Sequence, residues 1–477
     1  MQALGLKNKN FVFSDEVKLL ISLIFSAVFG ATLIGGNTAL YAVTSLIAVC
    51  FLVVVVILKP YLFLAVFFAV SYPVSQTVGK LEVNNLGILF LLMLSLLAFL
   101  FIFQRKNFAV DKRRIAVFSS FYVIVAVVVV GALSGFLHSG NDSLETVVKF
   151  FVFGVIPASF LVVMPLNKEN MLSLLELSYY LNFIIFVGFS FAYWFFKLLN
   201  PSGFEDFFYG FDNPIGTSLF LMQFVLVSLL FSIFREISQK RRIFIYATVA
   251  LAFLYVMITF QRSFILAIAG ASGYFVVSKY KIGLKMVAVA LVAAAVFAVA
   301  LSNLSMFLNV HQISKLEKTM SFVEKLSKNK NILRTEENKD SGSIGIRIIK
   351  IIASWDKTKQ NIYFGNGLGT FSNTVGEDTY KYPHNIFYEF LYSTGLAGLF
   401  IFLFCAAKIF FKAHSSIKKI GNAKFKNMFL VANSFVVLCF VILQFSGGVM
   451  NIFPHVYFMM SCIVLALYWI NHSEKAE

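Results

Sequence analysis

The sequence contains few charged residues. Asp, Glu, Lys and Arg make up 13% of its 477 residues, whereas hydrophobic residues make up 59% and Phe alone occurs 58 times. A soluble core of this size cannot enclose so large an apolar fraction, so the composition excludes an ordinary soluble domain. We expect an all-α, polytopic integral membrane protein whose main partner is the lipid bilayer.

Cysteine is also scarce. The four cysteines lie inside long apolar runs, where small core residues are common: Cys50, Cys405, Cys439 and Cys462. They have no paired metal-ligand spacing and predict no structural disulfide. The sequence shows no metal-ligand cluster, and we expect neither a metal ion nor a cofactor.

Acidic residues are fewer than basic ones, 23 against 40, which gives a net charge of +17. A nucleic-acid-binding protein gathers its basic residues on one face or arm. Here they fill alternate connections between apolar runs, at 104–114, 235–242, 279–285 and 412–426. Because cytoplasmic loops are enriched in Lys and Arg, the pattern argues against nucleic acid and predicts that both termini are cytoplasmic.

Long apolar runs are abundant. A helix needs about 20 apolar residues to cross roughly 30 Å of hydrocarbon, and on this rule the sequence predicts fourteen spans. The third is the weakest because Pro73 interrupts it. The spans are 17–36, 39–58, 60–78, 86–103, 115–137, 147–165, 171–196, 215–234, 243–260, 263–279, 284–305, 385–407, 427–446 and 451–470.

One connection is long enough to be a soluble segment. Residues 306–384 separate about eleven helices in 1–305 from about three in 385–477, and by the alternation of charge this loop lies on the outer face. Its first half predicts a short amphipathic helix up to about residue 326, followed by a mobile stretch.

The second half of the loop predicts another helix. The segment 344–360 places Ile346, Ile349 and Ile352 on one helical face, with Arg347 and Lys350 away from it. We expect this helix to lie on the membrane surface. The glycines that follow, at 365, 367 and 369, predict a tight turn.

Two arginines are candidates for a site on the outer face. Arg262 lies in a connection of about two residues, which holds it at the outer boundary of the bilayer. Because a charge inside the membrane is costly, an arginine at this place has one of two roles. Arg262 is either an anchor whose side chain reaches the lipid headgroups or a cation of a functional site. Arg347 and Lys350 either contact solvent and lipid headgroups or belong to the same site.

His384 directly precedes an apolar run in a chain with six histidines. It is either an interfacial polar side chain or a general base, because histidine, with an ordinary pKa near 6.5, is suited to proton transfer at neutral pH. Pro383 fixes its own φ, and Asn385 is a candidate cap for the next helix. Glu389 lies about one turn further in, and Tyr382 is either a sugar-stacking or a belt residue.

Three segments carry a family resemblance. The segment 261–270, "QRSFILAIAG", resembles the Ser/Gln-Arg-Ser/Gly motif of the bacterial O-antigen ligase and O-antigen polymerase superfamily. Residues 342–371 are similar to its loop pattern, in which an Arg and an aromatic precede a GxGxxxF turn. Residues 382–403, "YPHNIFYEFLYSTGLAGLFIFL", resemble its His-Asn and Gly-(Leu)-x-Gly-Leu signature. Together the motifs span roughly 250–405.

The resemblance implies a glycosyltransferase of the bacterial cytoplasmic membrane with one large extracytoplasmic loop and commonly about twelve spans. The fourteen spans counted above depart from that number, so we expect about 12 to 14 transmembrane helices. Its donor is a polyprenyl-diphosphate-linked oligosaccharide, undecaprenyl diphosphate being the carrier. The resemblance implies catalytic roles for His384, Arg262 and Arg347. We add Lys350, Tyr382, Asn385 and Glu389 as candidates for binding the diphosphate and sugar.

The expected reaction follows from these roles. Arginine is always protonated and grips phosphate oxygens with two donors, so Arg262 and Arg347 are expected to hold the leaving diphosphate. His384 is expected to take the proton of the acceptor hydroxyl. Attack opposite the diphosphate inverts the anomeric centre without a metal.

Three functions remain open at this stage. A polymerase of surface polysaccharide repeats, which we favour, transfers the glycan to a second lipid-linked repeat. A ligase attaches it to lipid A core or to protein. A polysaccharide transporter or flippase also has many spans and little soluble chain. A chain-length regulator or a flippase is a further candidate partner.

Overall fold

The computed structural model describes most of the helices and one end of the long loop. The described residues are 15–35, 53, 62–65, 67, 100, 112–139, 155–163, 168–199, 214–234, 237–258, 262–280, 342–375, 378–380, 383 and 385–444. They form an all-helical protein apart from one hairpin of two three-residue strands.

Four helices within the described ranges contain segments long and apolar enough to cross a membrane. They are α5 (Lys112–Ser139), α8 (Lys168–Leu199), α16 (Ile386–Lys419) and α17 (Ala423–Leu443). Their apolar segments are Ser119–Leu137, Leu172–Ala192, Ile386–Lys419 and Phe425–Leu443. These confirm the spans predicted at 115–137, 171–196, 385–407 and 427–446.

Five other helices of the described part fall at further predicted spans: α1 (Asp15–Gly35), α7 (Ile156–Val163), α10 (Pro214–Phe234), α11 (Gln239–Ile258) and α12 (Arg262–Tyr280). The apolar segments of α1 and α10, Val17–Val28 and Phe220–Ile233, are shorter than a full span. Predicted spans such as 39–58, 86–103, 284–305 and 451–470 lie outside the described residues or nearly so, and the total of 12 to 14 stays a prediction.

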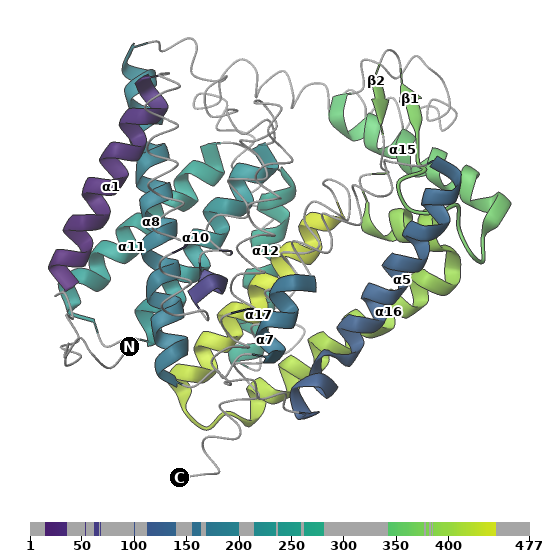
Figure 1. The fold of residues 1–477 in the computed structure, drawn as a ribbon. Coiled ribbons are helices and arrows are strands. Elements are labelled where there is room, and N and C mark those ends of the chain that lie inside the picture. Colours follow the sequence, from purple (N-terminus) through teal and green to yellow (C-terminus); the bar gives the residue numbers. More distant parts are fainter. Residues whose placement is uncertain are drawn as a thin grey trace.

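The helices pack as neighbours in a bundle (Figure 1). Helix α1 lies along α8, and α10 contacts α8, α11 and α17. Helix α12 lies along α17, and α5 lies along α16. Aromatic pairs fill the contacts: the rings of Phe186 and Phe224 stack with centroids 4.5 Å apart, and those of Tyr179 and Phe231 with centroids 4.6 Å apart. Such pairs add to the burial of apolar area.

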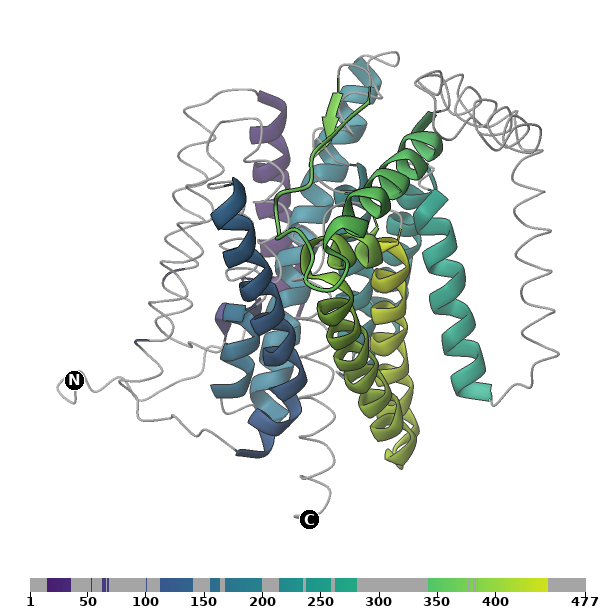
Figure 2. The same cartoon turned by 90° about the vertical axis from the view of Figure 1, so that its right-hand side faces the viewer.

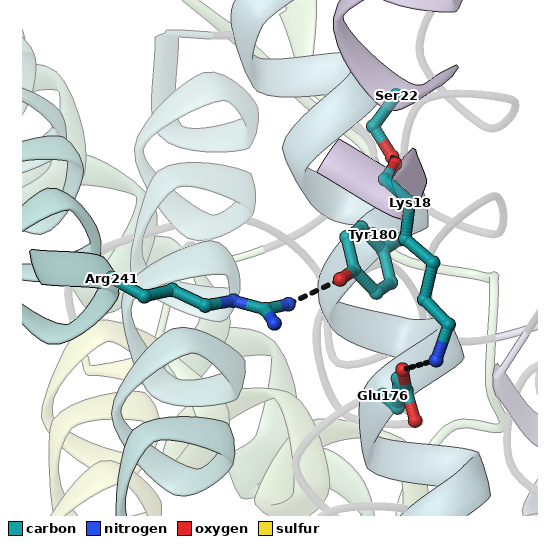
Figure 3. Close-up of polar contacts among 5 residues, drawn as sticks. All are labelled: Lys18, Ser22, Glu176, Tyr180 and Arg241. Atoms are coloured by element: carbon teal, nitrogen blue, oxygen red, sulfur yellow. Dashed lines mark hydrogen bonds and ion pairs between the residues drawn. The ribbon is translucent and has the colours of Figure 1, made fainter. Parts of the chain in front are cut away.

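Polar contacts also tie the N-terminal helices together (Figure 3). Lys18 Nζ on α1 lies 2.6 Å from Glu176 Oε1 on α8. Arg241, near the start of α11, donates to the hydroxyl of Tyr180, and its guanidinium lies 5.4 Å from the ring centre of Phe231. Trp194 on α8 also donates to the hydroxyl of Tyr255 on α11 at 2.7 Å, so polar contacts help to fix the register of these helices.

The described part of the long loop lies at one end of the bundle, which we call the α15 end (Figures 1 and 2). Helix α15 (Gly342–Thr358) runs into the short helix η6 (Lys359–Asn361). Strands β1 (Asn373–Val375) and β2 (Asp378–Tyr380) then pair antiparallel. Helix α15 confirms the second helix predicted for the loop, whereas the first, up to residue 326, lies outside the described residues.

Candidate functional site

Helix α16 begins with a capped turn at the α15 end. Asn385 has extended backbone angles, and its side-chain oxygen accepts hydrogen bonds from the amides of Phe387 (3.0 Å) and Tyr388 (3.3 Å). Two amides of the first turn thereby gain an acceptor. The structure confirms the predicted cap.

The same side chain joins α16 to the end of α17. The Asn385 amide nitrogen donates to the backbone oxygen of Gln444 at 3.1 Å and lies 3.4 Å from its Oε1. Phe387 and Phe440 add an edge-to-face ring contact with centroids 5.9 Å apart. The start of α16 is therefore fixed to the end of α17, 59 residues further along the chain.

Helix α16 is broken ten residues after its cap. Gly395 has φ 68° and ψ −170°, which no helix allows. The amides that follow the break bond outside the helix: Leu396 donates to the oxygen of Ile362 (2.8 Å) and Ala397 to that of Tyr363 (3.4 Å). Residues just after η6 thus replace the acceptors that the break removes.

The carbonyl oxygens before the break also accept hydrogen bonds from the segment that follows η6. The oxygen of Tyr392 accepts from the amide of Asn366 (2.7 Å), and that of Ser393 accepts from Gly367 (3.0 Å). Irregular backbone inside a membrane protein is tolerated only where its peptide groups find such partners. The segment 361–369, which we call the glycine loop, completes a helix that it precedes in the sequence.

Glycine at 365 and 395 follows from this close contact. Both residues have positive φ, 75° and 68°. A Cβ on Gly365 would lie 2.5 Å from the amide nitrogen of Thr394, and a Cβ on Gly395 would overlap the carbonyl of Tyr363. The predicted turn is confirmed, and its glycines allow two backbones to touch.

The glycine loop also binds α5. The amide of Leu368 donates to the oxygen of Gly131 at 2.7 Å, and a Cβ on Gly367 would lie 2.5 Å from the amide nitrogen of Gly135. The loop therefore fits between α5 and α16, near the α15 end of both helices (Figure 1).

Helix α15 lies alongside the first turns of α16. The hydroxyl of Ser354 donates to the oxygen of Tyr388 at 3.3 Å. This bond and the one between Leu396 and Ile362 both join residues 34 apart, so the two segments run in the same direction. Lys350, one helical turn before Ser354, therefore lies level with the start of α16.

The buried face of α15 is polar. Lys350, Ser354 and Thr358, spaced four residues apart, are 1%, 0% and 0% exposed, whereas Asp356 and Lys357 are exposed. The burial of Lys350 argues against one of its two predicted environments, contact with solvent and lipid headgroups, and is compatible with the other, membership of the site. Packing on α16 decides which face is buried, and the sequence of α15 alone does not contain that information.

Two further candidates flank this contact. Glu389, in the first turn of α16, is 7% exposed, and its negative charge lies at the favourable end of the helix dipole. Arg347, one turn before Lys350 on α15, is half-buried. Arg347, Lys350 and Glu389 therefore gather where α15 meets the start of α16.

Arg262 opens α12, which runs antiparallel to α17. A Cβ on Gly270 would lie 3.5 Å from Val441, and the Asn433 side chain donates to the hydroxyl of Tyr274 at 2.6 Å. Rising numbers along α12 therefore meet falling numbers along α17. The first turn of α12 lies at the α15 end, as does the end of α17 (Figure 2).

The structure thus brings several predicted residues to one end of the bundle: Arg347, Lys350, Asn385 and Glu389 with their side chains, and Arg262 by its place on α12. His384 and Tyr382 lie outside the described residues. Gln444 and Ser354 were not predicted from the sequence. Both act through contacts with residues far along the chain, for which the sequence holds no local signal.

This arrangement suits an anionic ligand. Basic residues belong to two elements, α12 and α15, at the same end of the bundle. Guanidinium and ammonium groups bind phosphate oxygens through charge-assisted hydrogen bonds, and low solvent access strengthens them.

Comparison with known proteins agrees with the motifs. Residues 247–403 match the model of a family described as O-antigen ligase. The match covers α12, α15, the glycine loop and the first half of α16, which are the elements that carry the site. No curated protein matches the chain.

Proposed function

We propose that the protein is a membrane glycosyltransferase that uses a polyprenyl-diphosphate-linked glycan, since residues 247–403 match the model of a family described as O-antigen ligase. The proposal is supported by one observation above all: the family-matched residues at the start of α12, on α15 and at the start of α16 lie at the same end of the bundle, where Arg347 and Lys350 of α15 lie beside the start of α16. We assign this end to the outer face of the bacterial cytoplasmic membrane and both termini to the cytoplasm.

The proposed leaving group is a diphosphate held at the membrane boundary. Cleavage of the bond between the anomeric carbon and oxygen leaves negative charge on that group, and Arg262, Arg347 and Lys350 stabilise it as it develops. The carrier chain stays in the bilayer. The diphosphate is already a good leaving group, so the scheme needs no metal or nucleotide.

The proposed base is His384. A sugar hydroxyl is too weak an acid to attack unaided, and a positioned base contributes about 10² to 10⁴ in rate. The hydroxyl attacks the face opposite the diphosphate, its proton goes to His384, and the anomeric configuration inverts. Glu389 and Tyr382 are proposed to contact the sugar or the diphosphate.

We favour a polymerase that joins polysaccharide repeats, with the second lipid-linked repeat as acceptor. The description of the matched family as a ligase supports a second candidate, transfer to lipid A core. Deleting the gene and separating the surface polysaccharide on a gel distinguishes them. Single-repeat product indicates a polymerase, and loss of all capped lipid A indicates a ligase.

The catalytic residues are tested with purified protein and the lipid-linked glycan that accumulates in cells lacking the gene. His384→Ala should lower turnover by about 10² to 10⁴, and Arg262→Ala should also weaken binding of farnesyl diphosphate, a short analogue of the leaving group. Wild-type turnover by His384→Ala would contradict the scheme. Movement of the lipid without its consumption would favour a transporter.

A further inference from the structure

The Asn385 side chain has its hydrogen-bonding capacity fully used within the protein. Its oxygen accepts from the amides of Phe387 and Tyr388, and its nitrogen has both carbonyl oxygens of Gln444 within reach. A primary amide has two donors and two acceptor sites. No site is left for a substrate, so a role for Asn385 acts through its neighbours.

Gln444 is itself held in place by α17. Its backbone amide donates to the oxygen of Val441 at 3.1 Å, and its side-chain nitrogen donates to the oxygen of Phe440 at 3.3 Å. It therefore closes the last turn of α17 and presents two oxygens to Asn385. Gln444 lies beyond the family-matched residues 247–403.

Helix α17 in turn is fixed to α12. The Asn433 amide donates to the hydroxyl of Tyr274 at 2.6 Å, and that hydroxyl lies 2.7 Å from Nδ1 of His414 on α16. One hydroxyl thus joins α12, α16 and α17. An unbroken series of contacts runs from Asn385 through Gln444 and α17 to the helix that begins at Arg262.

We propose that Gln444 and Asn385 are positioning residues for the transferase reaction. Their contact, the 385–444 clamp, sets the start of α16 relative to α17 and, through α17, relative to α12. His384 is bonded directly to Asn385 in the chain, and Arg262 opens α12. The inference rests on the proposed roles of these two residues.

Loss of the clamp is expected to lower the rate strongly, because the transition state forms only when the base, the sugar and the leaving group are correctly placed. A displacement of about 1 Å between a base and the leaving-group site costs about 10²-fold in rate. The substrate still binds through its lipid chain and phosphates. Loss of the clamp therefore lowers kcat and leaves KM nearly unchanged.

Asn385→Ser separates the clamp from the cap. Serine keeps an oxygen acceptor for the first-turn amides, but its side chain is too short to reach Gln444. With the glycan from gene-deleted cells as substrate, kcat should fall about 10- to 100-fold, with KM changed by less than about threefold. Asn422→Ser is the matched control: Asn422 caps the start of α17, at the opposite end of the same helix, through its 3.3 Å contact with the amide of Phe425.

Variants at Gln444 test the other half of the clamp. Gln444→Leu removes Oε1 and leaves the backbone acceptor, so kcat should fall by less than in Asn385→Ser. Gln444→Glu keeps an acceptor at that place and should restore most of the activity. Should Asn385→Ser not fold, this pair decides: equal kcat values for the Leu and Glu variants would overturn the clamp.

A double-mutant cycle shows whether the clamp acts through His384. In a His384→Ala background, measured over long incubations, Asn385→Ser should cause no further loss. A fully additive loss would refute the positioning role. The proposed function and the clamp can fail separately. Wild-type turnover by His384→Ala would refute the proposed role of His384 as the base. An inactive His384→Ala together with wild-type turnover by Asn385→Ser would refute only the clamp.

Discussion

Lys350 shows what a single residue adds to the site. Lys350, a residue that is only 1% exposed, lies on the face of α15 that packs on α16, level with the cap of that helix. Burial of a charge is costly unless other groups compensate for it. Among the predicted basic site residues whose side chains the structure describes, Arg347 and Lys350, Lys350 is the more buried.

We therefore expect Lys350→Met to lower turnover by about 10²-fold, a loss typical of removing one group that stabilises developing negative charge. Methionine has a similar length and keeps the packing. Lys357→Met is the control on the same helix, since Lys357 is exposed and donates to the backbone oxygen of Ser372. Steady-state rates of both variants are the measurement, and equal rates would assign Lys350 a purely structural role.

The glycine loop and α16 form one unit at the scale of elements. The loop supplies acceptors for Leu396 and Ala397 and donors for Tyr392 and Ser393, so the break at Gly395 leaves none of these four groups without a partner. The loop also binds α5, which makes the unit a three-way contact.

Gly365→Ala should lower the free energy of unfolding by about 2 to 4 kcal/mol, because it combines strain at positive φ with a 2.5 Å clash against the amide nitrogen of Thr394. Gly273→Ala on α12 is the control. No atom lies within 4 Å of its added Cβ, and alanine favours a helix by about 1 kcal/mol. Thermal unfolding in detergent compares the two, and a stable Gly365→Ala protein would show that the loop contact is dispensable.

At the scale of the whole molecule, α5 and α17 both begin at the end opposite α15, and α16 ends there (Figure 1). Lys418 and Lys419 close α16 at that end. The proposed orientation places this basic end in the cytoplasm, as the distribution of Lys and Arg predicts.

Cysteine labelling in intact cells tests the orientation. In a parent with its four cysteines replaced, Lys359→Cys on η6 should react with a membrane-impermeant thiol reagent because Lys359 is exposed at the α15 end. Lys418→Cys should react only after the cells are opened. The reverse pattern would place the site in the cytoplasm and contradict the proposed donor.

The sequence predicted those features that depend on neighbours along the chain. Span lengths, the helix at 342–358 and the cap at Asn385 follow from local patterns. The buried face of α15 does not, because Lys350 looks like a surface residue until α16 covers it. Gln444 and the partners of the glycine loop depend on contacts between distant residues, which only the fold supplies.

The break in α16 also bears on how the protein enters the membrane. Peptide groups without partners are expensive in hydrocarbon, and the partners of those around Gly395 come from residues 362–367, which are made first. By the proposed orientation, that earlier segment must cross the bilayer before α16 settles beside it. The order of synthesis and export therefore matters during membrane insertion. Until residues 362–367 have crossed the bilayer, the peptide groups around Gly395 lack their hydrogen-bond partners and α16 cannot reach its final conformation.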